Sequence, residues 1–245
     1  MQKDKNIIQI KYMINNIVLL ILFITSLMLL IQNYSTTVTR NTYLLNIILY
    51  LLVTLSLIGI TSNAVNYLDI DLNNISLLVI FIITLFSISL INSNNLIVNH
   101  LALLLFIIMI GLSLSIYSTA NNITTSIIIT SFIVILFSII GYNLPTEYQN
   151  EILKILPYLN MILLMFIIIS LIMLFTNRTS NKYLDVSIII LFILYILVDS
   201  IIINNQVSNN LYENMKHNEI NYPNKIIGMV LNFINILGRI INIRR

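Results

Sequence analysis

The sequence of 245 residues contains no cysteine and no tryptophan, and it has only two histidines, five glycines and three prolines. Without cysteine the chain has no disulfide, no thiolate nucleophile and no cysteine-ligated metal. His100 and His217 are far apart and the glycines are scattered, so neither a metal-binding cluster nor a glycine-rich phosphate loop is present. Since no nucleophile and base pattern is found either, we expect no enzyme activity and no bound cofactor.

Charge is also scarce. Charged residues make up 9% of the chain, whereas hydrophobic residues make up 58%. A soluble domain carries about 25% charged residues, so this composition indicates a polytopic membrane protein whose main partner is the lipid bilayer. The net charge of +3 is small, and we interpret it as a topology signal. Binding to nucleic acid is not expected.

Eight apolar segments are present, and most approach the roughly 20 residues that a helix needs to cross a bilayer core of ~30 Å. They cover residues 17–31, 42–60, 75–91, 98–117, 124–142, 157–175, 183–205 and 222–245. The sequence therefore predicts an all-α polytopic transmembrane helical bundle with seven to eight membrane helices. Residues 1–13 form a polar N-terminal lead, and residues 14–245 form a single transmembrane domain.

The cations predict the orientation, because cytoplasmic loops carry an excess of Lys and Arg. With a cytoplasmic N-terminus, seven cations face the cytoplasm: Lys3, Lys5, Lys11, Arg178, Lys182, Arg244 and Arg245. Four face the other side: Arg40, Lys154, Lys216 and Lys225. We therefore expect both termini in the cytoplasm, with residues 1–13 as a cytoplasmic lead.

The seventh segment contains Asp199, the only acidic residue set well inside an apolar segment of helical length. It lies about four or five residues from the end of the segment, on the order of 6–8 Å inside the apolar layer at 1.5 Å per residue. A charge at that depth costs several kcal/mol unless it is protonated, paired or hydrated. We expect a compensating group on a neighbouring helix; the alternative is a water-filled vestibule.

The eighth segment supplies candidate partners. Asn232 and Asn235 are three residues apart and so share a helical face, and Arg239 follows one turn later. An amide can donate to a carboxyl group in either protonation state, so a contact between Asp199 and Asn232 would form at any pH. In the simpler alternatives the amides bind neighbouring helices, Arg239 caps its helix or meets lipid phosphate, and Asp185 is solvated at the mouth of its segment.

These two segments carry a pair of short motifs. Residues 198–203 read VDSIII, and residues 231–237 read LNFINIL. The pattern resembles the Bax inhibitor-1 (transmembrane Bax inhibitor motif) family, in which an aspartate near the end of the penultimate helix faces a second aspartate in the last helix. That second aspartate falls on Asn232 here, so the pH response of the family's latch should be blunted.

The resemblance covers roughly residues 43–245 and has functional implications. It implies a pH-sensitive leak channel for calcium or protons that suppresses cell death at the endoplasmic reticulum or Golgi. Calcium would then be a transported ion, and other membrane proteins of the cell-death machinery would be partners. Asp199, Asn232, Asn235 and Arg239 would form the ion pathway or latch. Family members have six or seven membrane segments, which leaves one surplus helix among the first three.

Two other functions fit the same composition. A non-catalytic structural subunit or scaffold of a membrane complex would tolerate replacement of Asp199 by Ala or Leu. A proton-coupled transporter would have two similar halves with broken helices near mid-membrane, and no convincing internal repeat is found.

Overall fold

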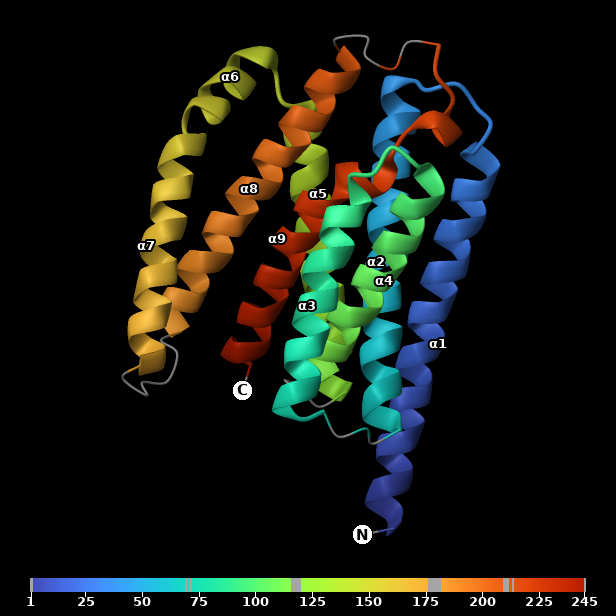
Figure 1. Cartoon of the computed structure of the whole chain (residues 1–245), viewed down its shortest axis with the longest axis vertical. Coiled ribbons are helices and arrows are strands. Elements are labelled where there is room, and N and C mark those ends of the chain that lie inside the picture. The colour runs from blue at the N-terminus through green and yellow to red at the C-terminus, as the bar shows by residue number, and fades with distance from the viewer. Residues whose placement is uncertain are drawn as a thin grey trace.

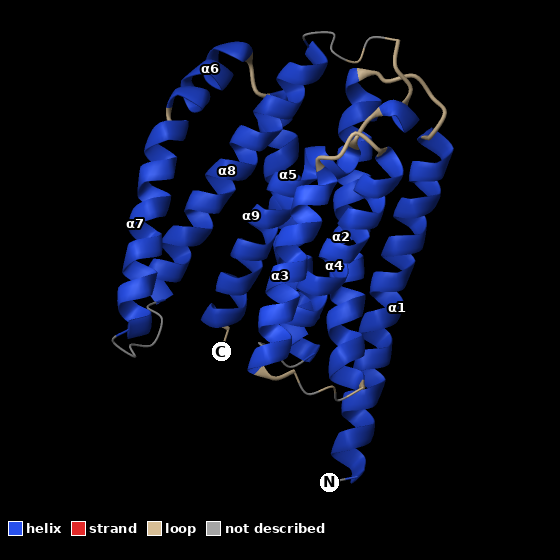
Figure 2. Ribbon diagram, in the orientation of Figure 1, coloured by secondary structure: helices blue, strands red, loops and turns tan. Residues whose placement is uncertain are grey.

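The computed structural model describes the whole chain apart from Met1, Asp69, Asp71, residues 116–119, 176–181 and 209–211, Glu213 and Arg245. The described residues form nine α-helices and one short 3-10 helix (Figure 1, Figure 2). They are α1 (Gln2–Asn33), α2 (Arg40–Tyr67), α3 (Asn74–Ile91), α4 (Leu96–Ser115), α5 (Ala120–Asn143), α6 (Thr146–Lys154), α7 (Leu156–Phe175), α8 (Lys182–Ser208), η1 (His217–Glu219) and α9 (Tyr222–Ile243). The predicted all-α bundle is confirmed.

The long helices run alternately up and down, and α1 begins at the same end of the bundle at which α9 ends (Figure 1). α1 takes in most of the segment predicted as a polar lead. α6 lies at the opposite end, between α5 and α7. Of the cations used to predict the orientation, Arg178 and Arg245 lie outside the described residues.

Membrane spans can be counted by length and composition within the described ranges. Six helices are long and apolar enough to cross a membrane, and the bent pair of α6 and α7 raises the number to seven. The bend between α6 and the first part of α7 is 42°. The apolar part of α3, Ile75–Ile91, is shorter. Each of the eight predicted apolar segments lies largely in a helix, and the upper count of seven spans agrees with the lower end of the seven to eight membrane helices predicted.

Local sequence sets several helix boundaries. The hydroxyl of Thr39 accepts from the backbone N–H of Thr42 and starts α2, and the side chain of Asn73 accepts from the N–H of Ser76 and starts α3. Such side chains satisfy backbone donors that a helix leaves free at its N-terminus. Proline lies in the first turn of α9, where its missing N–H is harmless.

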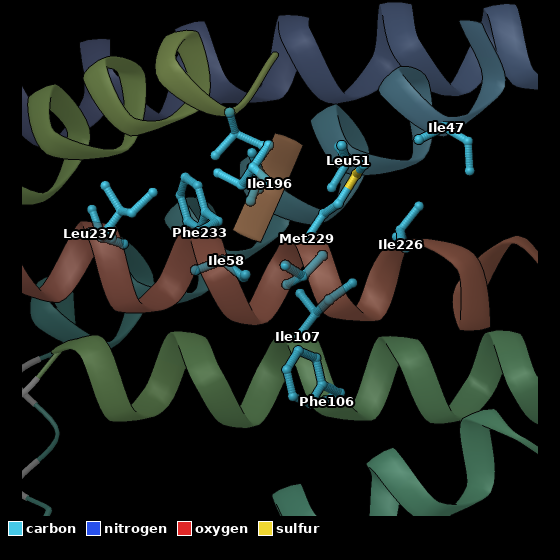
Figure 3. Packing of buried hydrophobic residues seen from close by; sticks show 14 of the residues in the cluster. Ile47, Leu51, Ile58, Phe106, Ile107, Ile196, Ile226, Met229, Phe233 and Leu237 are labelled. Atoms are coloured by element: carbon cyan, nitrogen blue, oxygen red, sulfur yellow. The ribbon is translucent and has the colours of Figure 1, made fainter. Parts of the chain in front are cut away.

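α9 lies at the centre of the bundle. Its buried face carries Ile226, Met229, Phe233 and Leu237, which recur every three or four residues and face side chains of α2, α4 and α8 (Figure 3). This spacing keeps one stripe of a 3.6-residue helix in the core. Because other helices surround this face, the packing of the whole bundle fixes the rotation of α9. That rotation determines the direction in which the polar side chains of α9 point.

α7 lies at the edge of the bundle. It packs against α8 and exposes large apolar side chains, among them Met161, Leu164 and Met165. A large exposed apolar surface of this kind is what a bilayer covers. The hydroxyl of Tyr195 on α8 donates to Asn160 Oδ1 on α7 at 2.6 Å. α8 therefore lies between the peripheral α7 and the central α9.

Candidate functional site

The candidate site lies where α8 packs antiparallel to α9 (Figure 1). Two acidic residues of α8, Asp185 and Asp199, are fourteen residues apart. Since an ideal helix drifts only ~20° per heptad, two heptads bring the second residue back to nearly the same face. At 1.5 Å per residue the two positions are about 21 Å apart along the helix. Both acids can therefore reach α9, one near its end and one near its middle.

The inner contact joins Asp199 to Asn232. The Asn232 amide nitrogen donates to Asp199 Oδ2 at 2.8 Å. Asn232 is 9% exposed, and Asp199 is half-buried. In the described part of the chain no basic side chain is paired with Asp199. The predicted contact between the acid and the amide is present, and its donor is uncharged.

Gly228 on α9 leaves room for the Asp199 carboxyl group. It precedes Asn232 by one helical turn, and a Cβ atom built on it would come within 3.2 Å of Asp199 Oδ2. That distance is tighter than an ordinary van der Waals contact, so alanine would press on the carboxyl group. The missing side chain therefore lets the acid lie against the backbone of α9 while it accepts the amide hydrogen bond.

α5 holds the same part of α8 from another side. A Cβ atom on Gly141 would meet the backbone oxygen of Leu197 at 2.8 Å and Ser200 Cβ at 2.9 Å. Such small residues let membrane helices approach closely. Because Leu197 and Ser200 flank Asp199, the close approach of α5 restricts the part of α8 that carries the acid.

The outer contact is an ion pair that sequence reasoning did not find. Arg239 Nη1 lies 2.9 Å from Asp185 Oδ1, with Asp185 1% exposed and Arg239 28% exposed. The expectation that Asp185 is solvated is wrong, because its side chain is buried and paired with Arg239. Arg239 binds this acid, and among the described residues no contact between Arg239 and Asp199 is found. The spacing of the two acids on α8 was the signal that could have predicted the pair.

Asn235 does not join the site. It is exposed, and its amide donates to the backbone oxygen of Leu231 in its own helix at 2.9 Å. Asn232 lies at the edge of the buried stripe of α9, and three residues of helix turn Asn235 about 60° further away. The expectation that the two amides face the same partner is therefore wrong.

The chemistry available at the site is limited to polar and ionic contacts. Among the described residues, no group of three or more His, Cys, Asp or Glu side chains is placed to hold a metal ion. A resident calcium ion takes six to eight oxygen ligands, and the inner contact offers a single carboxyl group. The described residues of the inner contact therefore provide one carboxyl group and one amide, far fewer oxygen ligands than a resident calcium ion takes.

Comparison with known proteins identifies a family. The family model described as Inhibitor of apoptosis-promoting Bax1 matches residues 35–244. The match includes both helices of the candidate site and begins after α1, which lies outside it. No curated protein and no solved structure matches the chain.

Proposed function

Because the chain belongs to the Bax inhibitor-1 family, we propose that this multi-pass membrane protein forms a leak pathway for calcium ions or protons, with the contact between Asp199 and Asn232 as its latch. The observation that supports this proposal is an acid held between two membrane-spanning helices by a neutral donor. Acidic residues inside membrane segments are costly and commonly mark ion pathways. The proposed leak requires no catalytic chemistry.

The arrangement of charges supports the same proposal. Arg239 is engaged by Asp185, so Asp199 has an uncharged partner in the described structure. A carboxyl group without a fixed cation can attract a mobile one. Opening the inner contact would break one hydrogen bond, while the outer ion pair could keep α8 and α9 together. Movement of the helices about that ion pair would then admit the ion.

The amide of Asn232 should also change how the latch responds to pH. The Asn232 amide can donate to a carboxylate or to the carbonyl oxygen of a protonated acid, so the latch remains closed in both states. Two acids at this distance would instead share a proton and repel each other after losing it. We therefore propose that opening of the latch depends only weakly on pH, so the pH profile of the leak reflects no more than the shallow, single-proton loss of the Asp199 charge.

The test is a calcium flux assay on protein reconstituted in liposomes, from about pH 6 to about pH 8. We expect a slow flux for the unmodified chain with a shallow pH profile. Asp199→Asn should lower calcium flux because the attracting charge is lost. Asn232→Asp should steepen the pH profile because it places a second acid 2.8 Å from the first in the present geometry.

Asn235→Asp is the matched control, since it makes the same change on the exposed side of the same helix. It should leave the pH profile unchanged. If no form conducts calcium or protons, the leak proposal is wrong and a non-conducting scaffold becomes the better hypothesis. Equal pH profiles for Asn232→Asp and Asn235→Asp would exclude the latch.

We further propose that the protein resides in the endoplasmic reticulum or Golgi, has both termini in the cytoplasm and suppresses cell death. The start of α1 and the end of α9 lie at the same end of the bundle, which supports a common side for the termini. Protease digestion of sealed vesicles carrying a tag at either end tests the orientation: both tags should be removed from outside.

A further inference from the structure

A cavity at the end of the bundle away from the start of α1 plays no part in the proposed leak. It has a volume of about 360 Å³ and lies where α1, α2 and α4 meet the loop that carries η1. A neighbouring hollow of about 410 Å³ shares Tyr50, His100 and His217 with it. Binding sites for small molecules have volumes of about 300–1,000 Å³, so this cavity is large enough for a ligand.

The lining changes from apolar to polar along the cavity. Phe23 on α1 and Leu57 on α2 line its deep part, whereas His100 and His217 line the part near the loop. On α1 the lining extends from Phe23 to Ile31, which is about 12 Å at 1.5 Å per residue. This gradient suits a molecule with a long apolar body and a small polar end.

The hydrogen bonds of His100 determine whether the Tyr50 hydroxyl is available to a ligand as a donor or as an acceptor. His100 Nδ1 lies 2.7 Å from the backbone oxygen of Leu96, which can only accept. Nδ1 therefore carries the proton, and in the neutral ring Nε2 accepts. Its partner is the Tyr50 hydroxyl at 2.9 Å, which must donate. The Tyr50 oxygen keeps its lone pairs for a donor in the cavity.

A second chain of hydrogen bonds determines the protonation of His217. Asn33 donates to Asn46 Oδ1 at 3.1 Å, so the group of Asn46 left to interact with the Tyr222 hydroxyl is its amide nitrogen, which can only donate. Tyr222 in turn donates to His217 Nδ1. Burial lowers the pKa of His217, which keeps its ring neutral, so the remaining proton is on Nε2.

His217 Nε2 is a donor without an acceptor. The residue is 4% exposed and lines the cavity, and among the described residues Nε2 has no hydrogen-bond partner. A buried donor left unpaired costs about 1–3 kcal/mol. An acceptor from outside the chain would remove this cost. Near its polar end the cavity thus presents an unpaired donor on His217 and an acceptor on Tyr50.

We propose that this cavity binds an uncharged membrane lipid bearing a hydroxyl group. The hydroxyl oxygen accepts from His217 Nε2, its proton goes to the Tyr50 oxygen, and the apolar body lies along α1 and α2. The residues that line the two hollows in the described ranges include no Lys, Arg, Asp or Glu. A phosphate or carboxylate head would therefore lack a counter-charge, whereas a hydroxyl satisfies both polar groups.

The test uses photo-crosslinking in liposomes that contain the full chain. The probes are a diazirine sterol and a diazirine diacylglycerol, each with a free hydroxyl, and a diazirine fatty acid provides the charged comparison. Adducts of at least one hydroxyl probe should map by mass spectrometry to residues 23–34, 96–107 or 215–222. The unlabelled hydroxyl lipid should compete for these adducts, and its methyl ether should compete about fivefold less well, as expected for loss of one hydrogen bond.

Val53→Phe fills the cavity from α2, and Val79→Phe makes the same change on an exposed face of α3. Val53→Phe should abolish the competed labelling, and Val79→Phe should leave it unchanged. His217→Phe, which keeps an aromatic ring beside Tyr222, should reduce it. Equal labelling in the two valine variants, no competed labelling by either hydroxyl probe, or stronger labelling by the fatty acid would overturn the proposal.

Discussion

The two contacts between α8 and α9 use the same kind of acid with different partners. At the outer contact Asp185 is buried and meets the cation of Arg239, whereas at the inner contact Asp199 is half-buried and meets the neutral amide of Asn232. Breaking a buried ion pair leaves an uncompensated charge and costs about 3–5 kcal/mol. Breaking a hydrogen bond to a charged group costs about 1.5–3 kcal/mol. The outer contact is therefore the stronger of the two, which makes it the anchor in the proposed latch and the inner contact the part expected to open.

Arg239→Leu should produce the largest effect on this comparison, because it leaves the carboxyl group of Asp185 buried without a cation. We expect a loss of about 3–5 kcal/mol, seen as a fall in the thermal unfolding midpoint on the order of 10 °C in detergent. The double variant Asp185→Asn with Arg239→Gln removes both charges and should recover most of the loss. Equal losses for the single and double variants would show that the ion pair is not the anchor.

Asp199→Leu should have a smaller effect. It leaves the Asn232 amide without its acceptor, at a cost of about 1–3 kcal/mol, but it also removes an acid whose burial is itself unfavourable. Asp199→Asn keeps an acceptor and should change the thermal midpoint less. A larger loss for Asp199→Leu than for Arg239→Leu would reverse the roles assigned to the two contacts.

Two glycines of α9 sharpen the comparison further. Alanine favours a helix over glycine by about 1 kcal/mol, and nothing lies within 4 Å of a Cβ atom at Gly238. Gly238→Ala should therefore raise the midpoint. At Gly228 the new methyl group would press on Asp199 Oδ2, and such overpacking costs about 1–3 kcal/mol. Gly228→Ala should therefore be neutral or destabilising, and equal gains at both positions would contradict the close approach.

The smallest expected effect comes from His217, outside the membrane helices. Burial lowers its pKa from the ordinary 6.5, so as the pH falls through about 6.5 the unfolded chain binds a proton that the folded chain does not. Stability is therefore lost as the pH falls, until the pH is below the folded pKa. The thermal midpoint between about pH 7.5 and about pH 5.5 measures this loss.

His217→Gln should flatten that pH profile, while His100→Gln should retain the part due to His217. The inner contact between Asp199 and Asn232 should remain intact over the same range, because an amide donates to either form of the acid. A profile that is unchanged in His217→Gln would assign the pH dependence to another group.

Helical architecture was predictable because it depends on local properties. Long apolar segments separated by polar loops specify membrane helices, and the contact between Asp199 and Asn232 followed from an acid and an amide on consecutive segments. Asp185 was misjudged for a physical reason: its position in the first turn of α8 suggests water, yet packing against α9 leaves it 1% exposed. The prediction that Asn235 joins Asn232 at the site was wrong because a helical face is wide. Only the packing of the bundle decides which part of that face is covered by neighbouring helices.

By itself, the sequence determined a membrane bundle of helices with one acid deep in its penultimate segment, since hydrophobic length and the cost of buried charge act on each segment separately. Only the tertiary structure decided which acid meets Arg239, that Gly228 makes room for Asp199, and that His217 closes a cavity with a free donor. Those features depend on the rotation and approach of neighbouring helices, which are set jointly by side chains that are distant in the sequence.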